Sequence, residues 1–297
     1  MRAKVVKIAV LLVVGPAFLG SAQSSGASRF PDLRILFRDT HWVAYAPTNY
    51  DPQAQPPKIP GNGSIREDLS VLRRAGCDGL VTYGASLPQV VDIAQAVGFK
   101  AILLGVWDPA SEEELRLAAS SAENRIVVGV IVGNEGLMFK RYTASNLKEA
   151  MDSVRKVTRK PVATTEVVDA YYTKPELIEW SDFLAVNAHP FFHGKRQPDD
   201  AAEWTWAVWK RLRERVPADK AILFKEVGLP SAGEPGLTEQ AQKDYYFKLR
   251  KTDVQFVFFE AFDAMFKRGP VEQSWGLFRA DRSPKPAAAA MAKGMGQ

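Results

Sequence analysis

Cysteine and histidine are scarce in this sequence of 297 residues, which contains one cysteine, Cys77, and three histidines. A single cysteine excludes an intramolecular disulfide, so a core of apolar side chains must stabilise the fold. No histidine lies near Cys77 in the sequence, which favours a buried, unreactive thiol. His189 and His193 have a spacing that metals sometimes use, but Pro190 prevents a helix between them and no third ligand is evident. We therefore expect no metal and no other cofactor.

Long apolar runs are also missing, apart from one near the start of the chain. Three basic residues within the first seven precede an apolar stretch over residues 8–19, and Gly20, Ser21 and Ala22 follow it. This arrangement is typical of a secretory signal peptide, and the stretch is shorter than the ~20 residues that span a bilayer. We expect residues 1–22 to be cleaved after Ala22, leaving a secreted or periplasmic protein without a membrane partner. The alternative is an uncleaved anchor.

A strong excess of one charge is absent as well. The first 22 residues carry three basic side chains and no acidic one, so their removal lowers the formal net charge from +5 to +2. The densest basic segment, residues 210–215, lies in a predicted helix and is expected to be a solvated face. Nothing in this charge distribution requires a nucleic-acid partner, and we expect a monomer.

Short apolar runs alternate with longer helical patterns through the rest of the chain, which is typical of βα units in the α/β class. Most runs are nearly continuous in aliphatic residues, as expected for parallel strands covered on both faces. An open doubly wound sheet is the alternative, but no glycine-rich phosphate loop follows the first run. The sequence therefore predicts one (β/α)8 TIM barrel over residues 23–297. Its eight strands are expected at residues 42–47, 79–83, 101–107, 127–134, 161–167, 183–189, 221–227 and 256–262.

Capping signals predict where two of the helices begin. Ser64 is followed three residues later by Glu67, and Ser111 is followed in the same way by Glu114. Each pair has the spacing of a capping box, in which the two side chains satisfy free backbone N–H groups of the first turn.

Two carboxylates stand at the ends of predicted strands. Glu135 follows the fourth strand and Glu226 lies at the end of the seventh. A barrel of this type places its active site at the carboxyl ends of the strands, where these two side chains would face one another. Glycoside hydrolysis needs such a pair, one acid for the leaving oxygen and one carboxylate to attack or to activate water. The sequence alone does not give their separation, so retaining and inverting mechanisms both stay open at this point.

Several segments resemble glycoside hydrolase family 17, whose members cleave or rearrange β-1,3-glucans on a (β/α)8 barrel. The resemblance covers nearly all of the chain after the predicted signal peptide. It implies a retaining double displacement on β-1,3-glucan, with Glu135 as general acid/base and Glu226 as nucleophile. The segments that carry it are Gly133-Asn134-Glu135, Asn187-Ala188-His189-Pro190-Phe191-Phe192, residues 225–233, residues 262–267 and Trp275-Gly276-Leu277-Phe278.

Further residues near the predicted strand ends are candidates for binding a sugar. The amide of Asn134 could bind the 2-hydroxyl of the reacting sugar, and aromatic planes pack on the apolar faces of sugar rings. Glu166 and Glu260 could bind hydroxyls or instead be buried and paired, with Lys267 as a partner for Glu260. The predicted substrate-binding set is Asn134, Tyr45, Tyr83, Trp107, Glu166, Asn187, His189, Phe191, Lys267 and Trp275.

Three positions depart from the pattern of the resembled family. Leu229 replaces a tryptophan, Ala264 replaces a glutamate, and Val81 stands where an Arg-x-Tyr pattern is common before Tyr83. The third change removes a basic group that would act on a catalytic carboxylate. Two alternatives therefore stay open beside a hydrolase: a transglycosylase that uses the same two carboxylates, and a catalytically silent barrel that binds glucan.

Overall fold

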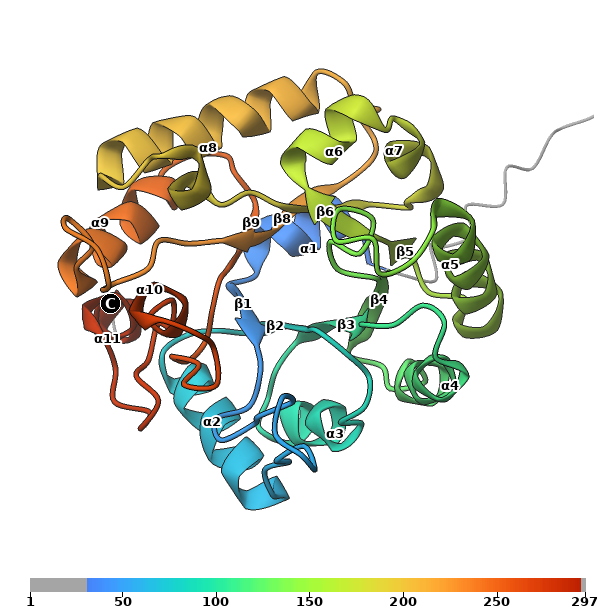
Figure 1. Ribbon diagram of the computed structural model, residues 1–297, viewed down its shortest axis with the longest axis horizontal. Coiled ribbons are helices and arrows are strands. Elements are labelled where there is room, and N and C mark those ends of the chain that lie inside the picture. Colours follow the sequence, from blue (N-terminus) through green and yellow to red (C-terminus); the bar gives the residue numbers. More distant parts are fainter. Residues whose placement is uncertain (1–30, 295–297) are drawn as a thin grey trace, which may run out of the picture.

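The structure, a computed structural model, describes residues 31–294 and consists of one ring of parallel strands surrounded by helices (Figure 1). The predicted signal peptide, residues 1–22, lies outside the described residues. The strands are β1 (Trp42–Tyr45), β2 (Gly79–Thr82), β3 (Ala101–Val106), β4 (Val127–Val132), β5 (Val162–Ala163), β6 (Thr165–Val167), β7 (Leu184–Asn187), β8 (Ile222–Val227) and β9 (Phe256–Phe258). The predicted (β/α)8 barrel is confirmed.

The fifth predicted strand is divided into β5 and β6 at Thr164. The hydrogen-bonded order is β5-β4-β3-β2-β1-β9-β8-β7-β6, so the two outer members of the sheet are consecutive pieces of one run. β5 pairs with β4, and β6 pairs with β7. The ring therefore closes through the covalent chain at this position, and the eight predicted runs account for all nine strands.

Alternate residues of each strand face two separate apolar regions. On β3, Leu103 packs inside the barrel with Val81 and Leu223, whereas Ile102 and Leu104 pack outward against the helices. Both faces are fully buried, which is why the strands read as continuous apolar runs in the sequence.

The helices form an outer layer around the ring in Figure 1. Phe37 of the first helix contacts the rings of Trp42 and Phe183, with centroids 5.8 and 5.5 Å apart, so this helix covers the amino-terminal end of the barrel. The helices are α1 (Leu33–Asp39), α2 (Asn62–Arg74), α3 (Gln89–Ala96), α4 (Glu112–Ser121), α5 (Ala144–Thr158), α6 (Val168–Thr173), α7 (Glu176–Trp180), α8 (Pro198–Arg213), α9 (Glu239–Leu249), α10 (Pro270–Gln273) and α11 (Pro286–Gly294).

One of the two predicted helix starts is wrong. α2 begins at Asn62 after Gly61, so Ser64 lies inside the first turn, where its hydroxyl accepts a hydrogen bond from Arg282. Ser111 does cap α4, because its hydroxyl accepts from the backbone N–H of Glu114. The carboxylate of Glu114 does not return to the cap. It accepts instead from backbone N–H groups after β2 and β3, at 2.9–3.0 Å, and so ties those two loops to α4.

Two other expectations concern single features. Cys77 is buried, and burial raises the pKa of its thiol to about 12, as expected for an unreactive cysteine. Within residues 31–294, no helix is both long enough and apolar enough to cross a membrane.

Candidate active site

The acid that follows β4 is positioned by a tight turn. Gly133 has φ +78° and Glu135 has φ +54°, in the left-handed region that residues other than glycine rarely adopt. A Cβ on Gly133 would lie 2.2 Å from the hydroxyl oxygen of Tyr142, so only glycine fits here. The backbone N–H of Glu135 donates to the carbonyl of Thr165 at 2.8 Å. This turn holds the Glu135 side chain at the carboxyl end of the barrel.

Glu135 has a neutral partner. Its Oε1 accepts from Nδ2 of Asn187 at 2.8 Å, and Oδ1 of Asn187 in turn accepts from the hydroxyl of Thr165 at 3.1 Å. The second hydrogen bond fixes the orientation of the amide, so that its NH2 group faces Glu135.

Glu226 has charged and aromatic surroundings. Nζ of Lys225 donates to its Oε1 at 2.5 Å, and Nε2 of His189 lies 3.1 Å from its Oε2. The side chain of Glu226 is only 6% exposed. A third acid, Glu260, is paired at 2.6 Å with Lys267, as the sequence suggested.

These partners shift the pKa values of the three carboxyl groups differently. Burial, together with repulsion from Glu226, raises the pKa of Glu135. Burial alone would also raise the pKa of Glu226, but Lys225 and His189 outweigh it and lower the pKa to about 2. Burial raises the pKa of Glu260 to about 6 despite the pull of Lys267. Glu135 is therefore suited to carry a proton while Glu226 stays ionised.

Both Glu135 and Glu226 line a cleft of about 790 Å³ at the carboxyl ends of the strands. Loops after β1, β2, β3 and β9 form most of its wall. Five of the predicted substrate-binding residues line it, namely Tyr45, Tyr83, Trp107, Asn134 and Lys267. The hydroxyl of Tyr83 is buried beside Glu226, and burial together with the negative charge of Glu226 raises the pKa of this tyrosine well above its ordinary value.

Two other predicted binding residues act on the carboxylates. Asn187 and His189 are absent from the wall of the cleft and instead contact Glu135 and Glu226, as described above.

Phe191 and Trp275 lie in aromatic packing beside His189, the partner of Glu226. The ring of Trp275 is fully buried and lies 5.3 Å from that of His189 and 5.9 Å from that of Phe191. Direct contact of Trp275 with a sugar does not fit this position, because its surface is covered by these rings. It supports the orientation of His189.

Glu166 also faces away from the cleft. Its two oxygens accept from the backbone N–H groups of Leu137 and Met138, at 2.8 and 3.3 Å, and its side chain is fully buried. Of the two roles that the sequence left open, these contacts favour the buried, hydrogen-bonded one. Glu166 anchors the loop that follows Glu135.

Lys225 is the site residue that the sequence reasoning did not assign. It stands next to Glu226 inside an otherwise apolar strand, and a buried ammonium group is costly without partners. The cost of burying this ammonium group is the feature of the sequence that could have indicated a role for Lys225. The wall of the cleft contains further residues that no sequence pattern singled out, including Tyr50 and Gln53.

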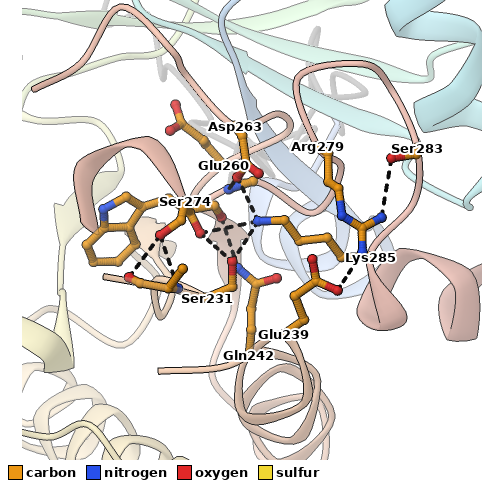
Figure 2. A network of polar contacts seen from close by, with 12 residues as sticks. Ser231, Glu239, Gln242, Glu260, Asp263, Ser274, Arg279, Ser283 and Lys285 are labelled. Carbon is orange, nitrogen blue, oxygen red and sulfur yellow. Dashed lines mark hydrogen bonds and ion pairs between the residues drawn. The ribbon is translucent and has the colours of Figure 1, made fainter. Parts of the chain in front are cut away.

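A second polar network lies behind the site and is drawn in Figure 2. Nζ of Lys285 donates to Asp263 at 2.6 Å and to the hydroxyl of Ser231 at 2.7 Å, and Ser231 donates to the carbonyl of Ser274 at 2.8 Å. Lys285 is 1% exposed. The network ties the loop after β8 to the segments before and after Trp275, and so supports the aromatic packing around His189.

Within residues 31–294, no group of three or more histidine, cysteine, aspartate or glutamate side chains has the arrangement of a metal site. The chemistry available to the residues that are present is that of two carboxyl groups with opposite pKa shifts.

A (β/α)8 barrel with such a pair in a cleft at the carboxyl ends of β4 and β8 has the architecture of a glycosidase. A family profile for the BtgE/BtgC glycoside hydrolase domain matches residues 43–276. The chain belongs to this family.

Relatives of known name are more distant. A putative glucan endo-1,3-beta-glucosidase, btgC, of Aspergillus niger is 27% identical over 281 residues, covering 76% of this chain and 40% of the relative. Cell surface mannoprotein MP65 of Candida albicans is 26% identical over 249 residues, covering 77% of this chain and 65% of the relative. The chain thus spans less than two thirds of either relative.

Solved structures share the fold. An active-site mutant of a Rhizomucor miehei beta-1,3-glucanosyltransferase, in complex with laminaritriose, superimposes with a TM-score of 0.71 at 23% identity. The match covers 84% of this chain and 96% of that one. A beta-1,3-glucanase and allergen of Cryptomeria japonica pollen gives a TM-score of 0.63 at 18% identity, covering 82% and 97% of the two chains.

Proposed function

We propose that the protein is a retaining glycoside hydrolase of the family 17 type that acts on β-1,3-glucan. The observation that carries the proposal is the unequal environment of the two carboxyl groups. Glu226 contacts the ammonium of Lys225, whereas Glu135 has the neutral amide of Asn187. Such an arrangement favours an ionised nucleophile and a protonated acid in one cleft.

The reaction follows from these two protonation states. In the first step Glu226 attacks the anomeric carbon, the glycosidic C–O bond breaks, and the leaving oxygen takes the proton of Glu135. In the second step Glu135, now a carboxylate, removes a proton from water, which attacks the anomeric carbon and releases Glu226 from its ester. Each residue returns to its starting state.

The residues of the cleft wall are proposed to bind the sugar. We expect the amide of Asn134, which lines the cleft, to bind the 2-hydroxyl beside the reacting carbon, and the buried Tyr83 hydroxyl lies next to Glu226. Trp107 is 44% exposed and borders the same cleft, as expected for a platform under a sugar ring. A β-1,3-glucan as substrate is supported by the names of the relatives, among them a putative glucan endo-1,3-beta-glucosidase.

Transfer to a second sugar is the alternative outcome of the same chemistry. The glycosyl ester on Glu226 is attacked by a sugar hydroxyl instead of water, with Glu135 removing the proton. The similarity to a beta-1,3-glucanosyltransferase of known structure favours keeping this outcome in the experiment.

The test is product analysis after incubation of the protein with linear β-1,3-gluco-oligosaccharides, with β-1,4-linked oligosaccharides as the matched control. Shorter products alone indicate hydrolysis, and longer products beside them indicate transfer. Binding without any new product, measured by calorimetry, would contradict the proposal and favour a silent glucan-binding barrel. Equal turnover of the β-1,4-linked control would contradict the choice of linkage.

A further inference from the structure

Lys225 occupies an irregular position in β8. Against β7, Val186 pairs with Phe224 and Asn187 with Glu226, so that Lys225 is an extra residue. The ladder with β9 has the same irregularity between Phe224 and Val227. Neighbouring residues of a regular strand point to opposite faces, whereas a bulge re-aims a side chain. Lys225 and Glu226 therefore both reach the carboxyl end of the barrel interior.

The ammonium group of Lys225 joins three parts of the site. Nζ lies 2.5 Å from Oε1 of Glu226, 2.7 Å from Oδ1 of Asn134, and 4.3 Å from the centroid of the Tyr83 ring. The side chain is 2% exposed. These contacts satisfy a buried cation with one carboxylate, one amide oxygen and one aromatic face.

We propose that Lys225 is a positioning residue that keeps the nucleophile Glu226 ionised and fixes the amide of Asn134 so that its NH2 group faces the sugar. The inference rests on the proposed function and deepens it. Lys225 supplies, from β8, a basic group that β2 lacks, since Val81 in β2 is a buried aliphatic residue of the barrel interior.

The orientation of Asn134 follows from the chemistry of an ammonium group. Lysine has only donors, so it must meet the amide oxygen of Asn134 and not its nitrogen. Nδ2 of Asn134, a donor, is left for the cleft that this residue lines. The oxygen of a sugar 2-hydroxyl is an acceptor of the kind that fits it.

The charge on Glu226 depends on several neighbours. The positive charge of Lys225 stabilises the ionised carboxylate, Nε2–H of His189 donates to it, and the negative charges of Glu135 and Glu260 oppose its ionisation. Lys225 is the cation in direct contact with it, and burial without Lys225 would favour the protonated form. The titratable groups that face Glu226 are Lys225 on β8, Tyr83 after β2, Glu135 after β4, His189 after β7 and Glu260 after β9.

The first experiment does not need turnover. The side-chain carboxyl of Glu226 is followed by 13C NMR in the full chain, with the signal assigned from Glu226→Gln. In the wild type it should stay ionised from about pH 6 down to about pH 3.5, below the ~4.3 of an ordinary glutamate. In Lys225→Met, which keeps the length of the side chain, the midpoint should rise by at least one pH unit.

Two variants serve as controls. Lys225→Arg keeps the positive charge and should restore a low midpoint. Lys100→Met removes an exposed lysine that pairs with the nearly buried Asp78 and should leave the midpoint of Glu226 unchanged. An equal midpoint in wild type and Lys225→Met would overturn the proposal. If Lys225→Met does not fold, the titration midpoint of Glu226 in the wild type is the test. A midpoint there equal to that of an ordinary glutamate would contradict a role for Lys225.

The second experiment tests the amide. The ratio of kcat/KM for an aryl β-1,3-glucoside and its 2-deoxy counterpart is measured in wild type, Lys225→Met and Asn134→Ala. We expect this ratio to be about tenfold smaller in both variants than in the wild type, a difference of ~1.4 kcal/mol. An unchanged ratio in Lys225→Met would contradict the positioning of Asn134. A wild-type protein that turns over neither glucoside would contradict the proposed function. The NMR titration would still test the effect of Lys225 on Glu226, because it does not depend on turnover.

Discussion

At the scale of single residues, three carboxyl groups of the site lie close together in space but have different partners. Glu226 and Glu260 each contact a lysine, Lys225 and Lys267, whereas Glu135 contacts an amide. If Glu135 were ionised as well, its negative charge would have no lysine in contact with it among these side chains. Of the two carboxyl groups proposed to react, Glu135 is therefore the one suited to hold the proton.

The pH dependence of kcat/KM follows from these environments. As the proposed nucleophile, Glu226 must be ionised, and its pKa is lowered to about 2, so activity should be lost only as pH falls toward that value. As the proposed acid, Glu135 must be protonated, and its pKa is raised, so activity should fall as pH rises through it. We expect a bell-shaped profile in initial rates on a β-1,3-gluco-oligosaccharide.

Two variants identify the basic limb of this profile. Glu135→Gln, assayed with an activated leaving group that needs no protonation, should lose the limb. Glu260 titrates as well, with a pKa of about 6, so Glu260→Gln should keep the limb if Glu135 causes it. A basic limb that persists in Glu135→Gln would count against the assignment.

The sequence predicted the carboxylates because each stands at the end of an apolar run, where burial of a charge needs a reason. It did not predict the role of Lys225, since regular alternation places this residue on the face opposite to Glu226. The bulge that brings both together depends on the registers of β7 and β9 with β8. These registers are long-range properties that no local pattern carries.

At the scale of elements, buried polar contacts fix the loops that form the site. Lys285 joins the loop after β8 to the segment around Asp263 (Figure 2). Glu114 of α4 joins the loops after β2 and β3. The start of α4 after Ser111 could be predicted, because its cap is local. The destination of the Glu114 carboxylate could not, because its partners come from other loops.

Lys285→Met should destabilise the protein strongly. The change leaves Asp263, whose side chain is 15% exposed, without the cation that pairs with it. Breaking a largely buried pair of this kind costs ~3–5 kcal/mol in the free energy of unfolding. Burial lowers the pKa of Lys285 and raises that of Asp263, each against the pull of the partner. Desolvation is therefore large at this pair, and Lys285→Met/Asp263→Asn should recover part of the loss. Denaturant unfolding measures both variants.

A matched control lies beside this pair. Arg279 and Glu239 are paired at 2.7 Å, but their side chains are 43% and 32% exposed. Arg279→Met should cost no more than ~1 kcal/mol, as is usual for ion pairs in contact with solvent. Equal losses for Lys285→Met and Arg279→Met would show that the buried network does not hold the loops as described.

At the scale of the whole molecule, the barrel could be predicted because eight apolar runs alternate with helical patterns. The division of the fifth run at Thr164 could not, since it depends on how the ring closes between β4 and β7. The separation of substrate-facing from supporting residues also needed the structure. Trp275 and Tyr83 were both predicted from the sequence to bind the sugar, yet only Tyr83 lines the cleft.

Export is a prediction about the part of the chain that precedes the barrel. The basic start, the short apolar run and the small residues at positions 20–22 lead us to expect cleavage after Ala22. N-terminal sequencing of the protein recovered outside the cytoplasm should begin near Gln23. Recovery of a chain that begins at Met1, held in the membrane fraction, would contradict cleavage and leave the catalytic proposal untouched.

The central claim is that Glu226 is the nucleophile and Glu135 the acid/base, and the most direct test compares two variants on two substrates. Glu226→Ala should be inactive on both a β-1,3-glucan and an aryl glycoside with an activated leaving group. Glu135→Ala should lose activity on the glucan by roughly 10²–10⁴-fold, the usual size of acid catalysis, and keep appreciable formation of the glycosyl-enzyme from the aryl glycoside. Near-wild-type rates on the glucan in both variants would contradict the assignment of the site.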